Sequence, residues 1–131
     1  MEYYLRAAKD DNTEALLNIG NFYKDGQGVK QNYSKAMEYY LRAAKDNNDQ
    51  ALLEIGNFYL HGYGVRKDST KALDYYLKAA ENENSEAYMN ILIVYRWAKG
   101  SNEYQALQQA ALKGNRIAQT IIGTDASDSS D

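Results

Sequence analysis

The chain lacks cysteine and proline and has a single histidine. Without cysteine it can form no disulfides, thiolate metal sites or cysteine nucleophile. His61 has no nucleophile or orienting acid in a recognisable arrangement, so its expected role is at the surface or at a helix end. We therefore predict a protein that is not an enzyme and has no catalytic residues, cofactor or metal. Because proline is absent, helices can run uninterrupted and turns must use glycine and polar residues.

The sequence also lacks a long apolar segment and an excess of basic residues. Its longest apolar run covers residues 91–95, far short of the roughly 20 residues of a membrane-spanning helix. The first residues show neither the basic nor the apolar part of a signal peptide. The net charge is −3, and no basic stripe is visible, which argues against nucleic-acid binding. The sequence predicts a cytoplasmic protein of one ordinary domain, with no membrane or nucleic-acid partner.

What the sequence does contain is an internal repeat with a period of 36 residues. The string EYYLRAAKD occurs at residues 2–10 and again at 38–46. Aligning residues 2–37 with 38–73 gives 23 identities in 36 positions. Self-similarity of this period is typical of stacked repeat proteins, in which each unit buries its apolar face on its neighbours.

Each unit reads as two amphipathic helices, here called A and B, because apolar residues recur at helical spacing. Asn12 or Thr13 is the expected N-cap of the first helix A, and Asn32 and Asp68 are those of two B helices. We predict helix A at 14–25, 50–61 and 86–98, and helix B at 2–10, 33–46, 69–82 and 102–113. The fold class is all-α, with antiparallel helix pairs stacked into an α/α superhelix.

The units divide the chain into a half repeat at 2–13, complete repeats at 14–49 and 50–85, a degenerate repeat at 86–115 and a terminal half repeat at 116–123. In the degenerate repeat, Leu92 replaces the glycine of the earlier units. That repeat is also about five residues short, which predicts a tighter turn. Residues 124–131 are acidic and have no large apolar group, which predicts a disordered tail.

The repeat resembles a known family, the Sel-one-like repeat (SLR), a relative of the tetratricopeptide repeat. The resemblance lies in Ala51, Ile55, Gly56, Tyr59, Gly62, Gly64, Val65, Ala72, Tyr75, Tyr76, Ala79 and Ala80. It covers nearly the whole chain and is weakest in the third unit. It implies an SLR/TPR-like solenoid that serves as an adaptor between other proteins.

Glycine and tyrosine also recur at the repeat period. Gly20 and Gly56 lie on the apolar face of helix A. A glycine inside a helix costs about 0.5–1 kcal/mol relative to alanine, so we expect a neighbouring helix to approach closely there. In the tyrosine pairs of helix B, Tyr40 should point inward. Its ring either packs between helices or forms part of a ladder of aromatic contacts for a partner.

In related superhelices, the other side of helix A lines the concave groove. Stacking the units places four rows there: Leu17, Leu53 and Met89; Asn18, Glu54 and Asn90; Asn21, Asn57 and Ile93; and Lys24, Leu60 and Arg96. Apolar area beside amides suits a peptide groove, and Trp97 is a candidate anchor. Alternatively, the leucine and methionine row packs on the adjacent unit and the asparagines are only solvated.

Three functions follow in order of preference. The first is a non-catalytic scaffold that binds a protein or peptide on the helix-A face. The second is a self-assembling structural protein, for example a homodimer through the N-terminal half repeat, because one flank of helix B at 2–10 should be bare. The third is an enzyme that uses a carboxylate pair, which the sequence does not identify.

Overall fold

The computed structural model describes residues 2–9, 12–97 and 102–129, and in these ranges it contains eight helices and no strand. The helices are α1 (Glu2–Lys9), α2 (Thr13–Asp25), α3 (Tyr33–Ala44), α4 (Asp49–His61), α5 (Ser69–Glu81), α6 (Ser85–Trp97), α7 (Asn102–Leu112) and α8 (Arg116–Ser129). The all-α fold class is confirmed. Helices α2, α4 and α6 are the A helices, and α1, α3, α5 and α7 are the B helices.

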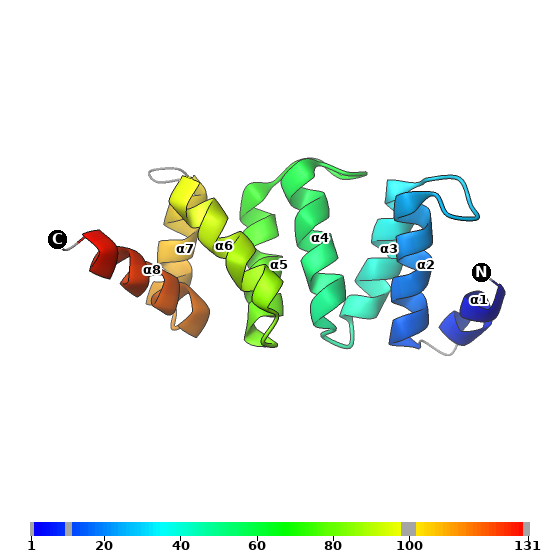
Figure 1. The fold of residues 1–131 in the computed structure, drawn as a ribbon, viewed down its shortest axis with the longest axis horizontal. Coiled ribbons are helices and arrows are strands. Elements are labelled where there is room, and N and C mark those ends of the chain that lie inside the picture. Colours follow the sequence, from blue (N-terminus) through cyan, green and yellow to red (C-terminus); the bar gives the residue numbers. More distant parts are fainter. Residues whose placement is uncertain (1, 10–11, 98–101, 130–131) are drawn as a thin grey trace.

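The helices follow one another along a single long axis, and the two termini lie at opposite ends (Figure 1). Contacts join neighbours in the chain: α2 packs on α3, α3 on α4 and α4 on α5. Helix α5 also contacts α7 and α8. Each unit therefore buries its apolar side on the adjacent units, as expected for a solenoid.

Asparagine caps the three A helices and also α8, and the caps of α6 and α8 tie these helices to a preceding unit as well. The side-chain oxygens of Asn12, Asn48, Asn84 and Asn115 accept a backbone N–H three residues later, at 2.8–2.9 Å. Asn84 Nδ2 also donates to Asp49 Oδ2 of the previous unit at 2.8 Å, and Asn115 Nδ2 donates to Glu81 Oε1 at 3.1 Å. The predicted caps Asn32 and Asp68 are confirmed.

The glycine within helix A makes room for a tyrosine of helix B. A Cβ atom at Gly56 would lie 2.6 Å from Cε1 of Tyr76, and one at Gly20 would lie 2.6 Å from Cε1 of Tyr40. Both tyrosines are fully buried. Their hydroxyls donate to Oδ1 of the asparagine that follows the glycine, at 2.5 Å in each unit. The predicted close approach is confirmed, and these tyrosines are packing residues.

The third unit replaces glycine, asparagine and tyrosine together. Leu92 and Ile93 occupy the glycine and asparagine positions of helix A. Leu107 takes the tyrosine position when the unit is aligned on its paired alanines, and it is buried in the same apolar cluster as Leu92. Without the ring, the glycine is unnecessary, and without the hydroxyl, the amide acceptor is unnecessary. The degenerate repeat is therefore a second, internally consistent way to fill the same space.

The Gly-x-Gly-Val loop of the second unit docks on the first unit. A Cβ at Gly64 would lie 2.9 Å from the backbone N of Ser34, at the start of α3. Tyr63 stacks on Tyr33, with ring centroids 4.8 Å apart, and Phe58 meets both rings edge-on. At Gly28, the matching position of the first unit, an added Cβ would meet nothing within 4 Å.

The seven helices from α1 to α7 begin and end within two residues of their predicted limits, but α8 does not. Helix α8 continues to Ser129, although a disordered tail was predicted from residue 124. No proline interrupts this stretch, and Gly123 does not adopt the positive φ that would end the helix. The predicted tighter turn of the third unit falls in residues 98–101, outside the described residues. Among the described helices, none is both long and apolar enough to cross a membrane.

Candidate functional site

Three successive A helices form a cavity of about 330 Å³, here called the helix-A groove. Its lining residues are Lys24 of α2, Glu54, Asn57, Phe58 and His61 of α4, Tyr63 of the following loop, and Glu86 and Asn90 of α6. Four of the predicted site residues therefore come together: Lys24, Glu54, Asn57 and Asn90. The volume is at the lower end of the range for ligand pockets, which suits one or two side chains of a partner.

An ion pair crosses the groove between the first and second units. Lys24 Nζ lies 3.3 Å from Glu54 Oε2, and the two side chains are 29% and 14% exposed. Gln50 Nε2 also donates to Glu54 Oε1 at 3.4 Å. With the carboxylate of Glu86 added, the lining residues that the structure describes include two negative groups and one ammonium. The groove is therefore slightly electronegative.

Buried tyrosines of the B helices hold the side-chain amides of Asn21 and Asn57 in a fixed orientation. Because Asn21 Oδ1 and Asn57 Oδ1 accept tyrosine hydroxyls, their Nδ2 groups remain to donate in the other direction. Burial, with a further contribution from the Glu54 carboxylate, raises the pKa of Tyr40 and Tyr76 well above the usual value near 10. Both hydroxyls therefore stay protonated and keep donating at neutral pH.

The leucine row does not line the groove. Leu53 is fully buried in an apolar cluster that contains residues of α5 and also Ala87 and Ile91 of α6. Leu17 is partly buried against the core. For these two residues the structure matches the alternative interpretation, packing on the adjacent unit, and neither lines the groove.

The other predicted residues fall into three groups. Met89 and Ile93 are 54% and 52% exposed, and the next helix in the A position, α8, packs chiefly on α7. Asn18 and Leu60 are half-buried on the A helices. Arg96 and Trp97 belong to α6, but their side chains lie outside the described residues.

Sequence reasoning missed the groove residues His61, Tyr63, Phe58 and Glu86. The rings of His61 and Tyr63 stack with centroids 5.2 Å apart. A signal was available, because His61 lies one helical turn after Asn57 and Glu86 one turn before Asn90. Extending the predicted rows by one turn would have found both residues.

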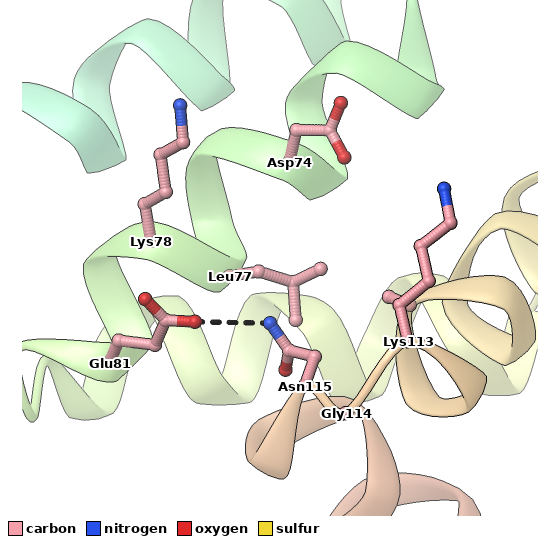
Figure 2. Close-up of a pocket in the computed structure, with 8 residues that line it drawn as sticks. Asp74, Leu77, Lys78, Glu81, Lys113, Gly114 and Asn115 are labelled. Carbon is pink, nitrogen blue, oxygen red and sulfur yellow. Dashed lines mark hydrogen bonds between the residues drawn. The ribbon is translucent and has the colours of Figure 1, made fainter.

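A second cavity, of about 540 Å³, lies between α5 and the turn that joins α7 to α8 (Figure 2). Its charges balance, with Asp74 and Glu81 against Lys78 and Lys113, and Glu81 is bonded to Asn115. A third, of about 590 Å³, is lined by Tyr59, Val65, Arg66, Lys67, Asp68 and Lys71. Neither contains a predicted site residue. Within the described residues, no group of three His, Asp or Glu side chains could hold a metal ion.

The Sel1 repeat family matches residues 1–12, 13–48 and 49–84 of the chain. The chain therefore belongs to the Sel1 repeat family, as the resemblance predicted. Sel1 repeat proteins generally mediate protein–protein interactions and are generally non-catalytic scaffolds. A search among curated proteins gave no significant match.

Two solved structures are similar along 90% of this chain. One is a Sel1 repeat protein from Oxalobacter formigenes, with 31% identity and a TM-score of 0.70. The other is c5321, a protective antigen of uropathogenic Escherichia coli strains with an SLR fold, with 28% identity and a TM-score of 0.74. The match spans 51% of the first protein and 26% of the second.

Proposed function

We propose that this chain is a non-catalytic scaffold that binds a peptide or protein segment in the helix-A groove. The observation that carries the proposal is the oriented amide of Asn57, which lines the groove and is held by the buried Tyr76. Asn21, half-buried on α2 outside the lining, is held by Tyr40 in the same way. A donor fixed in advance loses little conformational freedom when a partner's carbonyl group accepts from it. Within the described residues, no group of side chains could hold a metal ion, and the amides, carboxylates and aromatic rings of the groove suit binding.

Site-specific photo-crosslinking tests this proposal. A photoreactive residue would be placed at Ile93, which borders the groove, and in a matched protein at Leu41, an exposed aliphatic residue of helix α3. Expressed in cells, the Ile93 protein should give discrete crosslinked species by mass spectrometry, and the Leu41 protein should give few. Equal labelling from both positions would count against the helix-A groove as the binding surface.

Self-association is the second candidate, and one observation favours it. Leu5 of α1 is 38% exposed at the end of the stack, where a second copy could cover it. Light scattering over a hundredfold concentration range tests this candidate. A constant monomer mass would eliminate it, and a dimer lost in Leu5→Lys would favour it over the groove.

A further inference from the structure

We infer that the helix-A groove selects a partner segment with a lysine or arginine side chain next to an aliphatic one. The inference rests on the proposed function and specifies the chemistry of its partner. The basic side chain would enter the cavity between Glu54 and Glu86. The aliphatic side chain would cover the exposed pair formed by Met89 and Ile93.

The charge of the groove supports a basic side chain. Lys24, the one ammonium among the described lining residues, already lies 3.3 Å from Glu54. Glu86 lines the same cavity and is exposed, and hydrogen bonding or ion pairing by an incoming cation would neutralise the excess charge. A partner carboxylate would instead meet two like charges, which is unfavourable in a partly desolvated site.

The carboxylates of the groove also act on the buried tyrosine hydroxyls of the neighbouring B helices. Besides burial, the Glu54 carboxylate contributes to the raised pKa of both Tyr40 and Tyr76, Glu86 contributes at Tyr76, and Asp25 contributes at Tyr40. Each of these effects means that a negative charge near the hydroxyls is disfavoured. The same field favours a positive charge in the groove.

Surface apolarity supports the aliphatic neighbour. Along α6, Glu86, Asn90 and Ile93 follow one another at helical spacing, and Met89 lies beside Asn90. The face therefore changes from acidic to amide to apolar within two turns. Exposed aliphatic side chains that border a polar cavity provide buried area for a partner, while the amides of Asn57 and Asn90 can bond its backbone.

The experiment is selection of a random peptide library, displayed on phage, against the whole chain. Enriched peptides are then tested by fluorescence anisotropy against Glu86→Lys and against Asp74→Lys. The second variant makes the same charge change on α5, at the cavity in Figure 2. Circular dichroism confirms that both variants fold.

Enrichment of Lys or Arg beside an aliphatic residue is expected. Affinity should fall about tenfold or more in Glu86→Lys and stay within about twofold in Asp74→Lys. Two results would overturn the inference and leave the groove as a binding site. In the first, the enriched peptides bind the groove without a basic residue. In the second, Glu86→Lys and Asp74→Lys lower peptide affinity equally. If no enriched peptide is sensitive to Glu86→Lys or Ile93→Glu, the proposed function itself fails.

Discussion

Replacing the second glycine of each Gly-x-Gly-Val loop by alanine distinguishes two effects on stability. One is the cost of the backbone conformation, and the other is the docking of one repeat unit on another. Gly28 and Gly64 have nearly equal φ values, +72° and +66°. An alanine held in this left-handed backbone conformation costs about 1–2 kcal/mol at either position. Only at Gly64 does the new Cβ meet backbone atoms at 2.9 Å, those of Tyr33 and Ser34. These atoms belong to a capped helix and cannot move cheaply, so overpacking adds about 1–3 kcal/mol.

We therefore expect Gly28→Ala to lower the free energy of unfolding by about 1–2 kcal/mol and Gly64→Ala to lower it by about 2–5 kcal/mol. Urea denaturation followed by circular dichroism measures both losses, and unchanged m-values would show that the unfolded states are comparable. Gly123→Ala, inside α8 with open space around its Cβ, is a control that should not destabilise. Equal losses at Gly28 and Gly64 would refute docking of the second loop on the first unit.

Three further predictions follow from the packing. Gly56→Ala should lower the free energy of unfolding by about 1–2 kcal/mol, because the clash with Tyr76 outweighs the helix propensity gained. Tyr76→Leu introduces the residue type that the third unit has at this position. In a double-mutant cycle, the two changes together should lower stability by less than the sum of the single changes. Stability should fall above pH 10, because the raised pKa values keep Tyr40 and Tyr76 protonated only in the folded state, and these two groups contribute a slope of up to about 2.7 kcal/mol per pH unit. Tyr40→Phe should lower the measured slope by up to about 1.4 kcal/mol per pH unit in alkaline denaturation, and an unchanged slope would contradict the assignment. Asn84→Ala should cost about 1–2 kcal/mol in thermal or urea unfolding, because it removes a helix cap and the bond to Asp49, and a loss below measurement error would argue against both contacts.

Repetition made most of the fold predictable from the sequence. A pattern seen twice at a fixed offset identifies its variable positions as well as its fixed ones, so helix limits and caps such as Asn32 follow directly. Gly56 was informative because a costly residue in a helix implies a compensating contact. The end of α8 was not predictable in this way, since the last half unit has no second copy to compare with and composition alone suggested disorder.

The site was harder to predict, because a row drawn along helix A does not say which neighbour covers each position. Leu53 and Met89 hold equivalent places in their units, yet the first is buried in the core and the second is exposed. After α4, the next A helix is α6, whose Ala87 and Ile91 belong to the same buried cluster as Leu53. After α6, the next helix in the A position is α8, which packs chiefly on α7. In a solenoid, equal sequence positions therefore have unequal exposure wherever the stacking changes, and the polar-to-apolar transition of the groove occurs at such a place.

Ile93→Asn, which restores the side chain of the earlier units, should lower affinity for the aliphatic part of a bound peptide and leave the preference for a basic residue intact. Loss of the basic preference in that variant would show that the two halves of the groove do not act separately.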